Sequence, residues 1–184
     1  MAISYTPFTP ENFDFSSKGH IRAQTDIYPG LFGARRNQLD FEVLDINEAQ
    51  QLDFEEAIDR TVRVQVATLR GRLSFTVQER FRRLDASKYR DVTVTEWNHN
   101  SNLPSELYKI RAMLFLYGYY DETEDRFTEA IAFHVSPLLT KISRGEINFS
   151  RGRNPKNQSF ICVRFDELRN SGITAFYRNW NKTA

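Results

Sequence analysis

Hydrophobic and polar residues alternate with a period of two in two neighbouring segments near the middle of the chain, residues 59–68 and 73–83. In the first segment three valines face one way and Arg63 and Gln65 the other. Such alternation is typical of half-buried β-strands. The residues between them, 70–72, read Arg-Gly-Arg and supply a turn. The pattern therefore predicts a β-hairpin.

The rest of the chain divides into elements of both periods. A stripe at helical spacing, formed by Leu107, Ile110, Leu114 and Tyr117, predicts a long helix that begins at Pro104 and runs to about residue 120. The other expected elements are, in chain order, a helix over 47–57, a strand over 90–97, a strand over 126–135, a short helix closed by Gly145, a basic loop over 146–158, a strand over 159–165 and a last helix within 166–180.

Residues 1–38 are rich in Pro, Gly, Ser and Phe and show no sustained period. They predict an extended arm that packs aromatic side chains onto the body. With 184 residues and no internal repeat, the chain is expected to form a single domain. We expect an N-terminal arm over residues 1–45 and an α/β core over residues 46–184, with a mixed central β-sheet flanked by helices.

Composition narrows the choice of function only a little. At 40% hydrophobic and 27% charged residues the chain is globular. Lys and Arg number 25 against 24 Asp and Glu, so any surface for nucleic acid must be a local patch. The single cysteine, Cys162, excludes an internal disulfide and a cysteine zinc cluster, and the three histidines lack metal-ligand spacing.

The N-terminal residues lack the basic and apolar regions of a signal peptide. The longest apolar run is too short to span a membrane. We therefore expect a soluble cytoplasmic protein with no membrane partner.

The candidate catalytic side chains lie on the polar face of the predicted hairpin. Gln78 and Arg80 share that face, while Glu79 points to the other side with its apolar neighbours. An antiparallel register places Asp59 across from about residue 80, close to a glutamate of the preceding helix. Carboxylate and amide oxygens suit Mg²⁺, and a bound metal ion can activate a water molecule for attack on a phosphate. This set of residues is suited to phosphodiester hydrolysis.

The order of these features resembles the PD-(D/E)XK nucleases: a helix with Glu, a strand with Asp59, a turn, and a strand with Gln78-Glu79-Arg80. The resemblance covers about residues 47–120. It implies a restriction-endonuclease-like core and a metal-dependent DNA endonuclease that uses Mg²⁺ or Mn²⁺. Asp59 takes the position of the family's Asp, and Gln78 that of its metal-binding Glu. Glu56 matches the helix acid, with Glu55 or Asp53 as alternates.

Arg80 takes the position of the family's Lys, which is a departure from the pattern. Arginine keeps the positive charge but does not readily lose a proton to help a water molecule. The resemblance thus leaves Arg80 to stabilise the scissile phosphate. Lys109 on the following helix is an alternative substitute for the missing lysine, beside its reading as a solvated helix residue.

Basic residues near these features are the candidate contacts to DNA. They are Arg70, Arg72 and Arg82 around the hairpin, and Arg151, Arg153 and Lys156 in the basic loop. Such residues bind phosphates without reading bases. A homodimer is expected by analogy with the family, because cutting both strands of a duplex usually takes two sites.

A rival hypothesis keeps the nuclease fold but not the catalysis. Gln78 and Arg80 both depart from the family pattern in the direction that weakens metal chemistry. The near-neutral net charge also fits a protein partner. In this hypothesis the chain is a binding or assembly protein, and Asp59 and Glu56 are structural.

Overall fold

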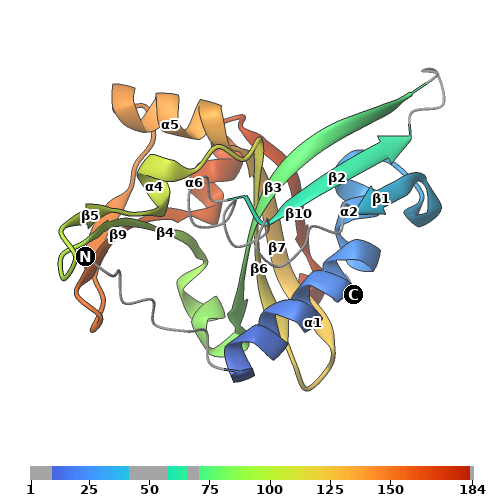
Figure 1. The fold of residues 1–184 in the computed structure, drawn as a ribbon, viewed down its shortest axis with the longest axis horizontal. Coiled ribbons are helices and arrows are strands. Elements are labelled where there is room, and N and C mark those ends of the chain that lie inside the picture. The colour runs from blue at the N-terminus through green and yellow to red at the C-terminus, as the bar shows by residue number, and fades with distance from the viewer. Residues whose placement is uncertain (1–9, 42–57, 66–70, 183–184) are drawn as a thin grey trace.

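A computed structural model describes residues 10–41, 58–65 and 71–182, and within these ranges the strands form two β-sheets (Figure 1). The helices are α1 (Pro10–Asp26), α2 (Tyr28–Phe32), α4 (Glu106–Lys109), α5 (Val135–Arg144) and α6 (Phe165–Asn170), with short 3-10 helices at Arg36–Gln38, Leu84–Tyr89 and Trp180–Lys182. The strands are β1 (Leu39–Phe41), β2 (Arg60–Gln65), β3 (Arg72–Arg83), β4 (Asp91–Asn98), β5 (Leu103–Pro104), β6 (Leu114–Asp121), β7 (Arg126–His134), β8 (Ser150–Arg153), β9 (Gln158–Arg164) and β10 (Thr174–Asn179).

The first sheet is mixed and has the strand order β1-β2-β3-β6-β7-β10. Strands β2 and β3 form the predicted antiparallel hairpin, in which Arg60 pairs with Val77 and Val64 with Leu73. Strand β3 then pairs in parallel with β6, and the remaining neighbours are antiparallel. The expected mixed central sheet flanked by helices is confirmed. The helix predicted over residues 47–57 lies outside the described residues.

The second sheet has the order β5-β4-β9-β8 and is antiparallel. Strand β4 matches the strand predicted over residues 90–97, but it leaves the hairpin and pairs with β9 near the end of the chain. The whole segment from residue 84 to residue 113 is therefore a crossover between the parallel strands β3 and β6. Parallel strands require such a long connection.

The long helix predicted from Pro104 is wrong. Only Glu106–Lys109 is helical, and the apolar run that follows forms β6. This strand lies between β3 and β7, with Phe115 and Tyr117 facing one core and Leu114 and Leu116 facing the other. A strand buried on both faces is apolar at every position, so its sequence does not alternate and imitates a buried helix.

The extended arm predicted at the N-terminus is also wrong over the described residues, because α1 occupies Pro10–Asp26. Its contact with the sheet runs along Phe15, Gly19 and Ala23, one residue per helical turn. A side chain at Gly19 would place its Cβ 2.6 Å from the ring of Phe81, so glycine allows the helix to approach β3. This helix contains Ser, Thr, Asp and Gly, which have low helix propensity, so its sequence does not predict a helix.

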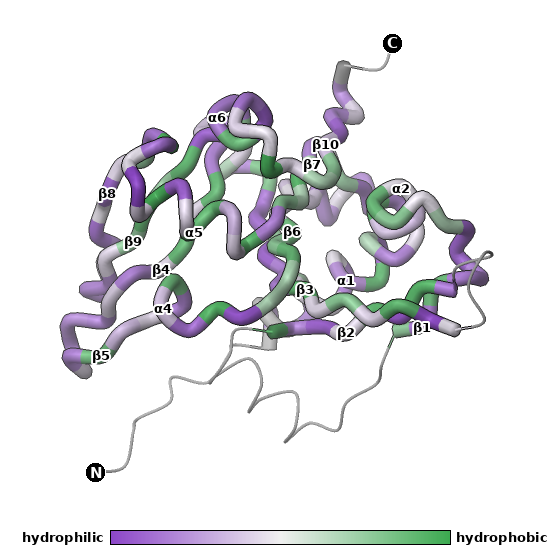
Figure 2. Tube along the Cα trace, turned by 90° about the horizontal axis from the view of Figure 1, so that it is seen from above, coloured by the Kyte–Doolittle hydropathy of each residue, from purple (hydrophilic) through white to green (hydrophobic). Residues whose placement is uncertain are grey.

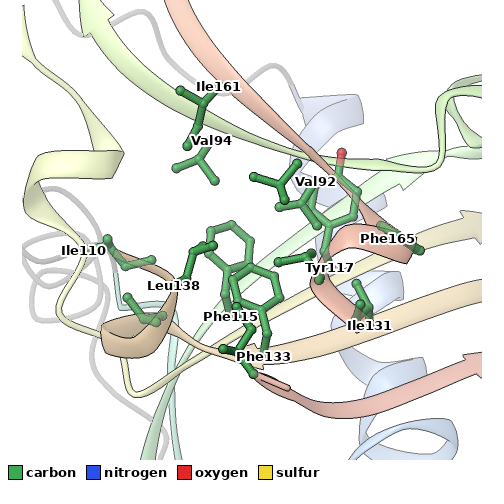
Figure 3. Close-up of a cluster of buried hydrophobic side chains, with 14 of the residues drawn as sticks. Val92, Val94, Ile110, Phe115, Tyr117, Ile131, Phe133, Leu138, Ile161 and Phe165 are labelled. Carbon is green, nitrogen blue, oxygen red and sulfur yellow. The ribbon is translucent and has the colours of Figure 1, made fainter. Parts of the chain in front are cut away.

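Two hydrophobic cores lie on opposite faces of the first sheet. The α1 and α2 side contains Phe15, Ala23 and Tyr28 against β2, β3 and β6. On the other side the second sheet closes over the first, and Figure 3 shows Val94 and Ile161 above Phe115 and Phe133, with Leu138 of α5 beside them.

The C-terminal third follows the predictions in part. Helix α5 ends at Arg144, and Gly145 adopts a positive φ of 68° as its C-cap, as expected. The loop predicted over 146–158 contains strand β8, which pairs with β9, and the predicted last helix stops at Asn170 and is followed by β10. Figure 2 shows hydrophobic residues along β6 and β9 and hydrophilic ones at the turns near β5 and β8. None of the helices in the described ranges combines the length and apolar composition needed to cross a membrane.

Candidate functional site

Asp59 stands at the start of the hairpin, across from Gln78. Arg60 pairs with Val77, so the residue before Arg60 falls opposite the residue after Val77. The Asp59 N–H donates to the Val77 carbonyl oxygen at 3.0 Å, and one Asp59 carboxylate oxygen accepts the Glu79 N–H at 2.6 Å. The sequence predicts Asp59 across from about residue 80, and the structure places it across from Gln78, two residues earlier. The carboxylate is fixed by the backbone of the second strand.

Gln78 is buried, with 5% of its surface exposed, on the face of β3 that looks toward the second sheet. Its Nε2 donates to Glu106 Oε1 at 3.3 Å, which fixes the orientation of the amide group. Its Oε1 is buried and has no hydrogen-bond partner among the described residues. A buried acceptor without a donor is costly, and such groups in proteins commonly meet water or an ion.

Arg80 lies two residues further along the same face and forms a partly buried ion pair with Glu106. The distance from Arg80 Nη2 to Glu106 Oε2 is 2.6 Å, and Arg80 Nη1 donates to the Thr93 carbonyl oxygen at 2.8 Å. Glu106 Oε2 also accepts the N–H and the hydroxyl of Thr95, each at 3.3 Å. In the described chain β5 pairs with this edge of β4 only at Trp97 and Asn98. Arg80 and Glu106 therefore bind backbone groups of β4 at residues that do not pair with β5.

Glu106 is a site residue that the sequence analysis did not find. It lies in the first turn of α4, after Ser105, and it is 8% exposed. The sequence predicts it in a helix from Pro104 to about residue 120, and that prediction contains no contact between Glu106 and the hairpin. Only the actual path, in which α4 stops and β6 pairs with β3, brings Glu106 to Gln78 and Arg80.

Burial also shapes the electrostatics beside Arg80. Tyr117 is its register partner on β6. Burial raises the pKa of Tyr117 above its ordinary value, and the nearby Arg82 and Arg80 act against that rise. The phenol is therefore neutral at physiological pH and serves as a hydrogen-bonding group rather than a base.

Glu79 points to the opposite face, as predicted, and there it holds α1 and α2 against the hairpin. Its carboxylate accepts a hydrogen bond from the Tyr28 hydroxyl and lies 2.9 Å from His20 Nδ1. The other ring nitrogen of His20, Nε2, lies 2.9 Å from Gln24 Nε2, and Arg36 donates to Gln24 Oε1. Burial, together with the charge of Glu79, raises the pKa of Tyr28 well above its ordinary value.

The other predicted site residues are dispersed. Glu56 and Arg70 lie outside the described residues. Lys109 is half-buried at the end of α4, three residues after Glu106, and its role stays a prediction. Arg82 is exposed at the far end of β3, whereas Arg72 pairs with Asp40 at 2.6 Å.

The basic-loop residues predicted to contact DNA lie on a β-hairpin formed by β8 and β9. Arg151 pairs with Glu96 at 3.3 Å, and Arg153 lies 3.1 Å from His99 Nε2. Lys156 is exposed in the turn between the strands. These three residues are brought together at one end of the second sheet, well separated in sequence from the hairpin site.

The described residues supply oxygen ligands for a metal ion, but few of them. No group of three or more His, Cys, Asp or Glu side chains suited to an ion occurs in the described ranges. The Asp59 carboxylate and the unpartnered Gln78 Oε1 are two hard oxygen donors at the same end of the hairpin. This donor set fits Mg²⁺ or Mn²⁺ better than softer metals.

Comparisons of the chain with protein-family models, with curated proteins and with solved structures gave no match. The resemblance to PD-(D/E)XK nucleases therefore rests on Asp59, Gln78 and Arg80 and on their order along the hairpin. What is established is a mixed α/β fold, with a buried polar site where β3, α4 and β4 meet.

Proposed function

We propose that the protein is a metal-dependent endonuclease that hydrolyses phosphodiester bonds in DNA. The observation that carries this proposal is the buried Gln78 Oε1, which lacks a partner among the described residues and lies at the position across from Asp59. A cation here would take Gln78 Oε1 as one ligand and the Asp59 carboxylate as another, because Mg²⁺ binds carboxylate and amide oxygens.

The residues divide into ligands and a charge stabiliser. Asp59 and Gln78 would hold Mg²⁺ or Mn²⁺, with Glu56 as a further ligand from the segment before the hairpin. The metal ion would supply an activated water molecule and neutralise charge on the phosphate. Arg80 would stabilise the scissile phosphate, since its guanidinium carries five N–H donors and only two make the contacts to Thr93 and Glu106.

The experiment is cleavage of supercoiled, linear and single-stranded DNA in Mg²⁺ and in Mn²⁺. The informative variant is Asp59→Asn, because an amide oxygen still accepts the Glu79 N–H while the charge needed for the metal ion is lost. Asp40→Asn is the matched control, since Asp40 is an exposed partner of Arg72 on the neighbouring strand β1.

We expect cleavage that depends on the metal ion, survives in Asp40→Asn and disappears in Asp59→Asn. We also expect Mg²⁺ to raise the melting temperature of the parent but not of Asp59→Asn, because a ligand that binds the folded state stabilises it. Absence of both cleavage and a metal-dependent melting shift would contradict the proposal.

The second candidate is a binding or assembly protein that keeps the fold without catalysis. The ion pair of Arg80 with Glu106 favours it, because the charge at the position of the family's lysine is already neutralised and bound to β4. This candidate predicts binding of DNA or of a protein partner, in a monomer or a homodimer, with no effect of Mg²⁺ or of Asp59→Asn on binding.

A further inference from the structure

Aromatic and apolar side chains are exposed at one end of the second sheet. Tyr108 on α4 is 63% exposed and Leu103 on β5 is 42% exposed. The half-buried ring of Trp97 meets Tyr108 edge-on, with 6.4 Å between ring centroids, and Trp97 pairs with Pro104 across β4 and β5. A patch of exposed aromatic and apolar side chains commonly marks a binding surface.

Two turns at the same end bring basic residues to this surface. The turn after β4 and the turn after β8 lie side by side, because Asn100 Nδ2 donates to the Lys156 carbonyl oxygen at 3.1 Å and His99 N–H to the Asn157 carbonyl oxygen at 3.1 Å. Arg153, the last residue of β8, contacts His99. Lys156 and Arg153 therefore both lie at this end of the sheet.

The aromatic and basic groups share one face of the sheet. Trp97 and Arg153 are the two register partners of Ser159 on β9, one from each side, and residues in direct register point to the same face. Glu96, the residue before Trp97, is paired with Arg151 at 3.3 Å. The surface formed by Trp97, Tyr108, Arg153 and Lys156, here termed the end surface, is therefore aromatic and positively charged.

Helix α4 connects the end surface to the hairpin site. Glu106, which binds Gln78 and Arg80, precedes Tyr108 by two residues on the same short helix.

We propose that the end surface binds single-stranded nucleic acid, with a base stacked on Tyr108 beside Trp97 and phosphates on Arg153 and Lys156. An aromatic platform next to cationic side chains is the common arrangement for unpaired strands, because each base offers a flat face and the backbone carries the charge. A duplex hides those base faces. The inference rests on the proposed nuclease function and narrows its substrate to an unpaired strand.

Binding is measured by fluorescence anisotropy with a labelled oligothymidylate and with its duplex, in EDTA so that no cleavage occurs. We expect Tyr108→Ala to weaken binding of the single strand by about 5- to 100-fold, which corresponds to the loss of one stacked base. Tyr108→Phe keeps the ring and should bind like the parent. Tyr89→Ala is the matched control, since Tyr89 is 57% exposed on the 3-10 helix before β4.

Salt dependence separates stacking from phosphate contacts. Each phosphate contact contributes about 0.7 to the slope of log K against log salt for a single strand. Lys156→Ala and Arg153→Ala should therefore each lower that slope by about 0.7, whereas Tyr108→Ala lowers the affinity and leaves the slope unchanged. Arg144→Ala, which removes an exposed cation from α5, should change neither.

The inference is overturned if the duplex binds as tightly as the single strand, or if Tyr108→Ala binds like the parent. Its failure is distinguishable from failure of the nuclease proposal. Single-strand binding without metal-dependent cleavage supports the end surface and contradicts the nuclease. Cleavage of duplex DNA without single-strand binding does the reverse.

Discussion

Arg80 and Glu106 form an ion pair at the point where β3 meets the edge of β4, with 2.6 Å between Nη2 and Oε2. Each partner also bonds the backbone of β4, Arg80 at the Thr93 carbonyl and Glu106 at the Thr95 N–H. The pair therefore connects the two sheets directly. Arg80, which the nuclease motif assigns to catalysis, thus also has a structural role. The two roles can be measured separately.

The first prediction concerns the stability of this junction. Glu106→Gln keeps an acceptor for Thr95 but leaves the charge of Arg80 without its partner in a site where Arg80 is 24% exposed. We expect a loss of about 2–4 kcal/mol in the free energy of unfolding, measured by urea denaturation. Combining Arg80→Met with Glu106→Gln should cost at least about 1 kcal/mol less than the sum of the single changes. Strict additivity would show that the pair is not coupled.

The second prediction concerns Gln78→Glu, which restores the family's carboxylate. Without metal the new charge lies against Glu106, whose Oε1 is 3.3 Å from Gln78 Nε2 in the parent. We expect the variant to lose about 1–3 kcal/mol of stability in EDTA, because a hydrogen bond becomes a contact of like charges. Mg²⁺ should recover the loss if the site binds metal. Gln78→Leu, which has no oxygen ligand, is the control and should not respond to Mg²⁺.

The third prediction concerns the packing of α1 on β3. In Gly19→Ala the added methyl group would stand 2.6 Å from Phe81 Cδ2, so helix or ring must move. We expect a loss of about 1–3 kcal/mol from overpacking, although alanine is the better helix former. Gly71→Ala is the control, since a Cβ there meets nothing within 4 Å. Equal unfolding midpoints for the two variants would refute the close contact of α1 with β3.

The fourth prediction follows from the buried Tyr28. Burial and Glu79 raise its pKa in the folded state above that of an unfolded tyrosine. The unfolded chain therefore loses this proton first, so the stabilisation is complete below about pH 10 and is lost as the pH rises toward the folded-state pKa. Urea titrations from about pH 8 to about pH 11 should show a shallower decline of stability in Tyr28→Phe, by up to about 1.4 kcal/mol per pH unit.

A matched change at Tyr89 tests whether burial is the cause. Tyr89 is 57% exposed, so Tyr89→Phe should leave the alkaline decline as it is in the parent. An identical decline in Tyr28→Phe and in the parent would mean that Tyr28 ionises equally easily in both states.

Local periodicity correctly predicted the strands and helices that have one hydrophobic and one polar face. The hairpin has valines on one face of β2 and Arg63 on the other, so its strands could be read from the sequence. The predicted register placed Asp59 across from about residue 80, two residues from its actual position across from Gln78. The end of helix α5 was also predicted correctly, because Gly145 follows it and adopts a positive φ as its C-cap.

The errors arose where tertiary contacts override the local pattern. Strand β6 has hydrophobic residues on both faces because it is enclosed by two cores, and no period of two survives. Helix α1 is held by close packing at Gly19 rather than by helix-forming residues. Glu106 reaches the site because α4 ends at Lys109 and β6 pairs with β3. A motif search on the sequence could therefore not have included it.

The pairing of β4 with β9 has a consequence for how the chain folds. Asp91 pairs with Arg164 and Asn98 with Gln158. The second sheet therefore cannot form until β9 has been synthesised, long after β4. Until then β4 presents an open edge, and contacts of such long range slow folding. During synthesis the crossover between β3 and β6 would need to stay unpaired while the first sheet grows around it. A chain cut before β8 should therefore aggregate rather than yield a smaller folded unit.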